Sequence, residues 1–400
     1  MQLNANCLKV IALGAVSTFP LILDASEETR FALKQSHYNE SDGRVAVHYT
    51  LLDIQQDFGT DYTANVSFSF DTVSGGTPIW VDTVSGASGK ALADGKIAVW
   101  FGVDESTGEV TAAGGNASRN AFRYQNTQID DERRAVSVNL VKRTPDRDEI
   151  TTGFSYSAES DFVSKEGSLS YLYNLDPSRN RSITVGASYQ RNDANHLLFN
   201  QWKDFNIVNA QIGYSHVIDK NTVGQINYFR TRQSGELSNP YQTIIRFIPT
   251  DGLYWRAVEK RPDEKNASGI STSLVSKLFG NTALHGEYRY YTDDWGMHSN
   301  TYTMTAHVTA DENWTISPML RYYTQGRVDF YKAHDSGEVF DELEYGSADE
   351  RLGAWHGTTY GLGLERKLGE GFKLNLHAAS QRQSNGLQMT WTALGIDYGF

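Results

Sequence analysis

The sequence has 400 residues, of which 39% are hydrophobic, and it carries a formal net charge of −12 at pH 7. No apolar run approaches the roughly 18 residues of a spanning helix, which excludes a transmembrane helix but leaves a transmembrane β-barrel open. The acidic balance and the lack of a basic stripe argue against a nucleic-acid partner. The single cysteine, Cys7, excludes disulfides and thiolate metal sites from the rest of the chain.

Residues 1–25 resemble a secretory signal peptide. Lys9 is the only charge before an apolar stretch from Val10 to Leu23, and cleavage after Ala25 is expected. Cys7 precedes the apolar stretch, so it does not resemble a lipoprotein acylation site. A packed or disordered N-terminus is the alternative interpretation. The mature chain is therefore predicted to be 26–400.

The rest of the chain alternates apolar and polar side chains in segments of about ten residues, as transmembrane β-strands do. In 301–310, one face carries Tyr302, Met304, Ala306, Val308 and Ala310, and the other carries Thr301, Thr303, Thr305, His307 and Thr309. About 16 such segments occur, an even number that is typical of bacterial barrels. The pattern predicts an all-β, antiparallel, up-and-down transmembrane barrel.

The connections between these segments alternate in length. The short ones read "FGTD", "DPSRN", "IDKN", "LFGN", "DEN" and "KLGEG", and the long ones include 72–132, 231–265 and 328–354. Short periplasmic turns and long outer loops are the asymmetry of bacterial barrels, and an even strand number leaves both termini on the short-turn side. The loop 72–132 is long enough to fold into the pore as a plug.

The chain ends in "TALGIDYGF", which resembles the C-terminal assembly signal of bacterial outer-membrane proteins. The resemblance implies the barrel-assembly machinery as a partner, outer-membrane lipid as the surroundings, and the bacterial outer membrane as the location. Aromatic girdles are expected at both water–lipid boundaries. The outer girdle is assigned to Tyr290, Tyr302, Tyr322 and Tyr360, and the periplasmic one to Trp314, Phe372, Tyr398 and Phe400.

The inward faces are polar and of mixed charge. If the turns are as short as they look, Arg289 and Arg321 lie at one height on either side of Thr303, and Glu365 lies opposite Lys373. Such a lining either shapes solute preference or reflects only the usual polarity of barrel interiors. The predicted lumen-lining residues are His285, Glu287, Arg289, Thr303, His307, Arg321, Glu365 and Lys373.

Two outer loops contain residues that could carry chemistry. Asp293, Asp294 and His298 share one loop, where a carboxylate–histidine hydrolase is conceivable, but no partner motif supports it. The segment 335–350 is acidic but lacks the spacing of a calcium loop. Solvated acidic loops are the simpler interpretation, and neither a catalytic role nor a metal site is predicted.

The chain resembles an uncharacterised family of bacterial outer-membrane barrels, known only as a domain of unknown function. The resemblance depends on "DTVSGAS", "DDERRAVSV", "LSNPYQ" and "KRPDEK", and covers nearly the whole mature chain. It implies a location and a fold rather than an activity.

The pentapeptide Asp-Thr-Val-Ser-Gly occurs twice, from Asp71 and from Asp82, and both copies are expected in the 72–132 loop. The second copy resembles the attachment motif for covalent FMN in secreted proteins, Asp-x-x-Ser/Thr-Gly-Ala-Ser/Thr. The matching residues are Asp82, Ser85, Gly86, Ala87 and the acceptor Ser88, with Thr77 as a weaker acceptor in the first copy. Because flavin transferases act before the outer side is exposed, attachment would have to precede insertion.

The predicted function is a porin-like conduit or scaffold for small polar solutes, without catalysis. The alternative is a flavinylated electron-transfer protein, with periplasmic redox proteins and an FMN transferase as partners. An outer-membrane hydrolase is the remote alternative.

Overall fold

The structure is a computed structural model of the chain. It describes residues 29–82, 102–103, 110–111, 122–128, 130–196, 201–250 and 253–400. The predicted signal peptide 1–25 lies outside the described residues. No helix within the described ranges has the length and apolar character to cross a bilayer.

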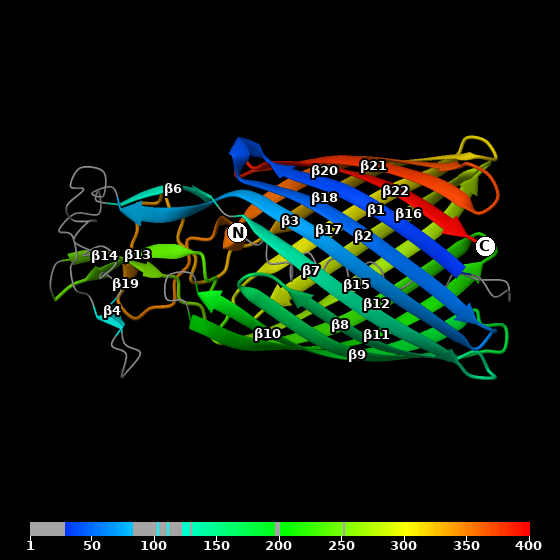
Figure 1. Cartoon of the computed structure of the whole chain (residues 1–400), viewed down its shortest axis with the longest axis horizontal. Coiled ribbons are helices and arrows are strands. Elements are labelled where there is room, and N and C mark those ends of the chain that lie inside the picture. The colour runs from blue at the N-terminus through cyan, green and yellow to red at the C-terminus, as the bar shows by residue number, and fades with distance from the viewer. Residues whose placement is uncertain are drawn as a thin grey trace.

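Sixteen antiparallel strands form a closed barrel, because the first strand pairs with both the second and the last (Figure 1). This confirms the predicted fold class. The strands are β1 (Thr29–Glu40), β2 (Val45–Phe58), β3 (Tyr62–Asp82), β7 (Asp131–Arg143), β8 (Glu149–Ala158), β9 (Phe162–Asn174), β10 (Arg181–His196), β11 (Gln201–Asp219), β12 (Thr222–Gly235), β15 (Glu264–Phe279), β16 (Thr282–Asp293), β17 (His298–Thr309), β18 (Trp314–Gln325), β20 (Trp355–Lys367), β21 (Phe372–Gln383) and β22 (Gln388–Gly399).

The period-2 alternation sets which side chains leave the barrel. In β17, Tyr302 and Met304 stand on the outer surface with 50% and 54% of their area exposed, and the intervening threonines face the lumen. The same outward face carries large apolar side chains on strands all round the barrel. Lipid rather than water suits such a surface, since burial against acyl chains removes this area from water.

One end of the barrel is closed by short turns, as the sequence predicts. Gly371 occupies such a turn with a φ of +78°, and a Cβ there would lie 2.2 Å from the carbonyl oxygen of Gly399, so glycine is required. The chain ends meet at this end, where Thr29 and Phe400 exchange backbone hydrogen bonds of 3.1 Å. Phe372 stacks on Tyr398 with a centroid distance of 4.1 Å, as part of the predicted aromatic girdle.

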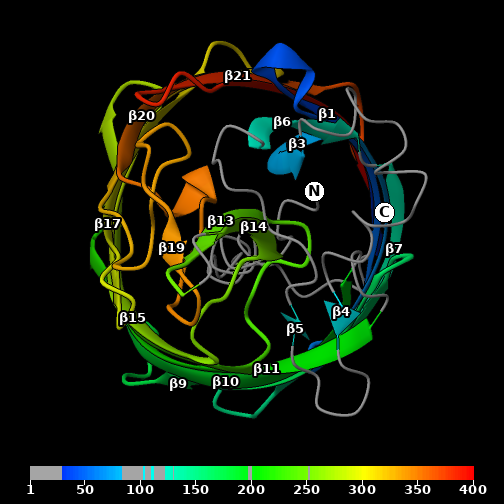
Figure 2. The same cartoon turned by 90° about the vertical axis from the view of Figure 1, so that its left-hand side faces the viewer.

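The other end carries an outer cap, which we define as 76–82, 122–128, 236–263 and 326–354. It contains β6 (Phe122–Gln128), β13 (Thr243–Ile248), β14 (Leu253–Val258), β19 (Phe340–Asp341) and the 3-10 helix η5 (Glu350–Leu352). Three further short elements lie outside it: η1 (Ser41–Gly43), β4 (Gly102–Val103) and β5 (Val110–Thr111). Viewed end-on, β13, β14 and β19 lie within the outline of the barrel (Figure 2).

The outer cap has its own apolar core. Its members come from all three long connections: Trp80, Phe122, Ile244, Ile245, Ile248, Trp255, Ala257, Phe340 and Ala348. Because these segments start on different sides of the barrel rim, burying their apolar side chains together draws them across the mouth. The barrel and the cap are thus two packing units within one chain.

Two sequence expectations about the long connections are wrong in their boundaries. The first Asp-Thr-Val-Ser-Gly copy, Asp71–Gly75, lies within β3 and not in a loop, because β3 continues past the barrel rim to pair with β6. Gly75 has a φ of +119°, and a Cβ there would lie 2.2 Å from the carbonyl oxygen of Arg44. The predicted loop 231–265 is shorter, since β12 runs to Gly235 and β15 starts at Glu264.

Candidate functional site

The lumen wall between β16 and β20 contains the largest group of predicted site residues. Glu287, Thr303, Arg321 and Thr359 lie directly opposite one another across four neighbouring strands. We call this group the lumen row. Arg289 was expected opposite Thr303 but lies opposite Thr301, and Glu287 takes the expected place.

The turn between β16 and β17 explains this two-residue difference. The Asp293 carboxylate accepts hydrogen bonds from the backbone N–H groups of Trp295 and Met297, at 3.1 and 3.0 Å. This side-chain cap centres the hairpin on Trp295. Turn chemistry of this kind fixes hairpin register, and register fixes which lumen residues meet.

The expected Glu365–Lys373 pair is also wrong by two residues. Glu365 lies opposite Asn375, and Lys373 lies opposite Lys367. The hairpin closes through the backbone hydrogen bond from Leu368 to Phe372, at 3.0 Å, which displaces the register. Both residues still face the lumen, but they do not form the predicted cross-strand pair.

Other lumen side chains partner one another in a mixed pattern. The Arg289 guanidinium lies 4.7 Å from the ring centroid of Phe229, a cation–π distance. His285 Nε2 lies 3.2 Å from a Glu287 oxygen, and His307 Nδ1 lies 2.9 Å from Ser317 Oγ. The lining therefore combines both signs of charge with hydroxyl groups.

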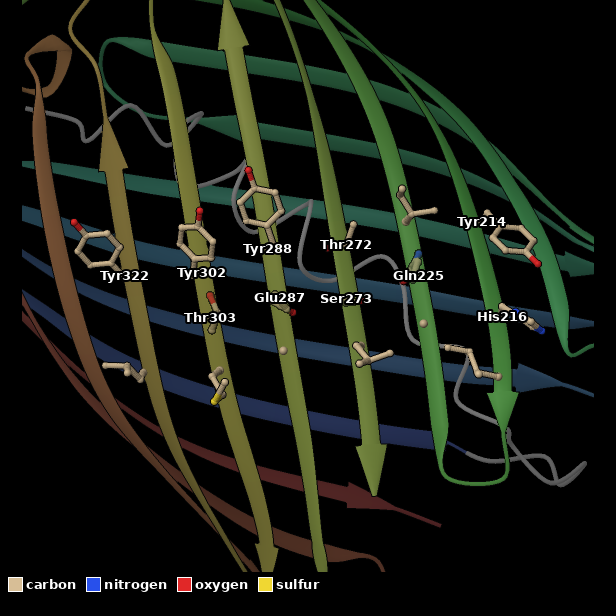
Figure 3. A pocket seen from close by; sticks show the side chains of 17 residues that line it. Tyr214, His216, Gln225, Thr272, Ser273, Glu287, Tyr288, Tyr302, Thr303 and Tyr322 are labelled. Atoms are coloured by element: carbon tan, nitrogen blue, oxygen red, sulfur yellow. The ribbon is translucent and has the colours of Figure 1, made fainter. Parts of the chain in front are cut away.

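A groove of about 730 Å³ crosses the opposite, lipid-facing side of the same wall (Figure 3). Gly224 and Gly286 leave it hollow, because neither has a side chain to fill the space. Outward apolar and tyrosine side chains flank it: Tyr214, Ile226, Leu274, Tyr288, Tyr302, Met304, Leu320 and Tyr322. The groove lies on the lipid-facing surface of the barrel and is not part of a path through the lumen.

The predicted flavin site lies largely outside the described residues. Ser85, Gly86, Ala87 and Ser88 are not described. Asp82 is the last residue of β3, and the backbone of Thr77 pairs with Thr127 of β6. The attachment stretch thus follows directly after a strand of the outer cap. Most of the predicted plug, 72–132, also lies outside the described residues.

The residues of the hydrolase alternative have structural partners. Asp293 forms a 3.0 Å ion pair with Lys265, in addition to capping its turn. Asp294 accepts hydrogen bonds of 2.9 Å from both the backbone and the side chain of Asn266. Among the described residues, no hydrogen bond joins the His298 side chain to either carboxylate.

Three of the carboxylates in the acidic segment 335–350 are also paired, those of Glu344, Asp349 and Glu350. Glu344 lies 2.5 Å from Lys332 Nζ, and Asp349 lies 3.0 Å from Arg261. These contacts hold the segment within the cap.

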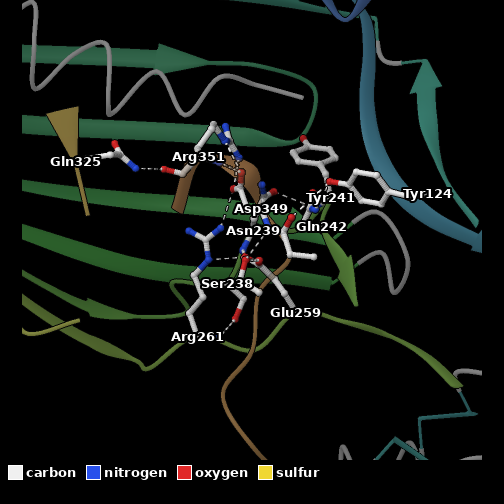
Figure 4. Close-up of polar contacts among 12 residues, drawn as sticks. Tyr124, Ser238, Asn239, Tyr241, Gln242, Glu259, Arg261, Gln325, Asp349 and Arg351 are labelled. Atoms are coloured by element: carbon white, nitrogen blue, oxygen red, sulfur yellow. Dashed lines mark hydrogen bonds and ion pairs between the residues drawn. The ribbon is translucent and has the colours of Figure 1, made fainter. Parts of the chain in front are cut away.

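A buried ionic network at the base of the cap was not predicted (Figure 4). Arg261 lies 2.5 Å from Glu259 and 3.0 Å from Asp349, and Arg351 lies 2.5 Å from Asp349. Ser347 donates a hydrogen bond to Glu259. The network joins 236–263 to 326–354, and Arg44 of the β1–β2 connection joins it to the rim through Glu350 at 2.7 Å.

The pKa values of its two acids move in opposite directions. Burial raises the pKa of Glu259 and outweighs the neighbouring Arg261 charge. Burial also opposes ionisation of Asp349, but the charges of Arg351 and Arg261 and the hydrogen bonds of Arg351 outweigh it and lower the pKa of Asp349. Of this network only Arg261 lies in a stretch that the sequence analysis quoted, "KRPDEK", and nothing within that stretch indicates a partner near residue 349.

Asp131, Glu159 and Asp161 bring their carboxylate oxygens within 4.8 Å of one another at the rim. Tyr241 of the cap donates a hydrogen bond to Asp161. Burial raises the pKa of Glu159 to about 8, with Asp131 and other acids adding to the effect. Such a carboxylate group could hold a cation, and it links a barrel turn to the cap.

The chain resembles several solved structures in fold. The chain matches a bacterial polysaccharide outer membrane secretin with a TM-score of 0.50 and 8% identity, covering 94% of this chain and 100% of the other. It matches CdiB from Acinetobacter baumannii with a TM-score of 0.52 and 8% identity, covering 94% of this chain and 61% of the other. It matches the siderophore receptor PirA from Pseudomonas aeruginosa with a TM-score of 0.43 and 10% identity, covering 90% of this chain and 57% of the other.

These likenesses show the fold alone, which is that of outer-membrane β-barrels. The chain spans less than two thirds of the PirA and CdiB chains. A comparison with curated proteins found no match. The family model described as "Protein of unknown function (DUF3570)" matches residues 7–202 and 193–396, so the chain belongs to the DUF3570 family.

Proposed function

We propose that the protein lies in the bacterial outer membrane and is a conduit for small polar solutes. The observation that carries the proposal is a closed wall of sixteen strands with an apolar outer face and a polar inner face. Barrels of about this strand number enclose an aqueous channel unless a loop fills it. The short turns would then face the periplasm and the outer cap would face the exterior.

The cap is part of this proposal. It lies across the mouth and is joined to the rim by Arg44–Glu350 and by Tyr241–Asp161. Solutes would enter where the cap and rim separate. We expect no catalytic role, since Asp293 and Asp294 have structural partners.

Planar-bilayer recording of the purified full-length protein tests the conduit. Stepwise conductance increases are expected on insertion. If no conductance appears, even from a variant without the β13–β14 hairpin, the conduit is wrong and a scaffold role remains.

The flavin alternative is favoured by one specific observation, the match of Asp82 to Ser88 with the FMN attachment pattern. The stretch would leave β3 at the cap, and Ser88 Oγ would form the phosphoester. The cofactor would supply the redox chemistry, and the protein would supply its position. The barrel would then be an electron-transfer element that works with periplasmic redox proteins.

Protein from its native host, denatured and run on a gel, tests this alternative. Flavin fluorescence is expected from the parent and not from Ser88→Ala, with Thr77→Ala as the matched control that retains most of the signal. Peptide mass spectrometry over 82–90 should show an FMN-sized increment. An unmodified peptide from a host with an active FMN transferase would contradict it.

A further inference from the structure

Arg321 differs from most arginines of the described chain because no carboxylate contacts its guanidinium. It forms no hydrogen bond and no ion pair with any residue that the structure describes, and its Nε is buried without an acceptor. Arg44, Arg133 and Arg261 each have a carboxylate within 2.7 Å. Glu287 acts on the Arg321 charge through space, without an ion-pair contact. A partly buried guanidinium that no carboxylate contacts is costly unless something in the lumen compensates it.

The neighbours of Arg321 in the lumen row are hydroxyl groups. Thr303 of β17 and Thr359 of β20 lie directly opposite it on either side. Thr359 is only 1% exposed, and its Oγ1 has no hydrogen-bond partner in the described part of the chain. The Thr359 hydroxyl and the Nε of Arg321, on facing positions, are therefore both buried without a hydrogen-bond partner.

The charges around the row select the kind of ligand. Arg289 adds a second positive charge one step along the wall, and Glu287 adds one negative charge next to Thr303. Arg321, Arg289 and Glu287 together carry one net positive charge. A singly charged anion balances this charge, whereas a phosphate dianion exceeds it and is repelled more strongly by the Glu287 carboxylate.

We propose that Arg321, with Thr303 and Thr359 on either side, is a binding site in the lumen for small monocarboxylate solutes. The planar guanidinium presents paired N–H donors to a carboxylate, and the threonine hydroxyls add donors beside it. The inference deepens the proposed conduit by naming its solute class. The inference rests on the proposed function only because solutes must be able to reach the lumen.

Calorimetry of the detergent-solubilised full chain with benzoate tests the site without requiring conductance. The parent is expected to bind benzoate, Arg321→Gln to bind it at least tenfold more weakly, and Thr359→Val to bind it several-fold more weakly. Arg321→Lys should fall between parent and Arg321→Gln, because it keeps the charge but loses the paired donors. Heat-dependent gel migration verifies that each variant is folded.

The matched control is Lys277→Gln, which removes a lumen-facing cation of β15 near the short turns and should leave benzoate affinity unchanged. The site is overturned if the parent does not bind benzoate, if Arg321→Gln binds it as the parent does, or if Lys277→Gln loses affinity equally. Inorganic phosphate binding as tightly as benzoate would overturn the monocarboxylate assignment. If Arg321→Gln does not fold, Arg321→Lys and Thr359→Val decide the question. Absence of bilayer conductance alongside intact benzoate binding would contradict the conduit and leave the site standing.

Discussion

The barrel wall and the outer cap bury opposite kinds of side chain. In the wall, Tyr360 is 66% exposed while the lumen-facing Asn192 is 0% exposed. In the cap, the apolar Ile244 and Ile245 are 0% and 2% exposed. The wall therefore exposes its apolar side chains and the cap buries them, and this difference indicates that the two parts have different surroundings. Lipid surrounds the wall, and water surrounds a cap that must hide its apolar residues.

The largest expected effect tests whether the cap is a separate packing unit. Arg261→Met leaves Glu259 and Asp349 buried without their shared cation and should destabilise the cap by about 3–5 kcal/mol. Hydrogen exchange should rise in 236–263 and 326–354 and stay low in the barrel strands. The control Arg232→Met removes an exposed ion pair with Glu264 and should cost about 0–1 kcal/mol. Loss of the barrel together with the cap would show that the two are one unit.

The next effect tests the lipid-facing assignment of the wall. Met304→Arg places a charge against acyl chains and should cost about 2–4 kcal/mol of folding free energy in lipid vesicles. Thr305→Arg, one residue away, faces the lumen and should cost far less. Urea titrations in vesicles measure both. Equal costs for the two variants would contradict the alternation of faces.

A pH-dependent effect concerns the joint between barrel and cap. Because the pKa of Glu159 is raised to about 8 in the folded state, its contribution to stability is present below its ordinary pKa and is lost as pH rises through about 8. Glu159→Gln should therefore remove this loss and leave the protein more stable than the parent above pH 8. The exposed turn residue Glu312 provides the control Glu312→Gln. Parallel thermal-stability profiles of parent and Glu159→Gln from pH 5 to 9 would refute this.

The sequence could predict the wall better than the cap, for a physical reason. Apolar and polar side chains alternate within each strand, so the inward positions of Thr303 and Arg321 follow from the local sequence pattern. The cap depends on contacts between residues such as Trp80, Ile244 and Phe340, which are far apart in the chain. A local sequence pattern does not indicate which apolar residues, far apart in the chain, pack against one another.

Register lies between these two cases. The two-residue errors at Arg289 and at Glu365 arose because hairpin centres depend on turn hydrogen bonds, such as those of Asp293. That no carboxylate contacts Arg321 depends in turn on register, since the register places threonines rather than carboxylates opposite the guanidinium. Glu287, Thr303 and Arg321 of the lumen row were therefore predictable from the sequence, but Thr359 and the way in which the four residues face one another were not.

The central claim is that the wall encloses a conduit whose mouth the cap covers, and the β13–β14 hairpin offers the most direct test. Gln242 and Glu259 flank the hairpin and are already joined by a 3.0 Å backbone hydrogen bond, so 243–258 can be replaced by a two-residue turn. The measurement is single-channel conductance of this variant relative to the full chain in planar bilayers. A several-fold increase is the predicted result. Equal conductance would contradict the covering role of the cap, and no conductance from either protein would contradict the conduit itself.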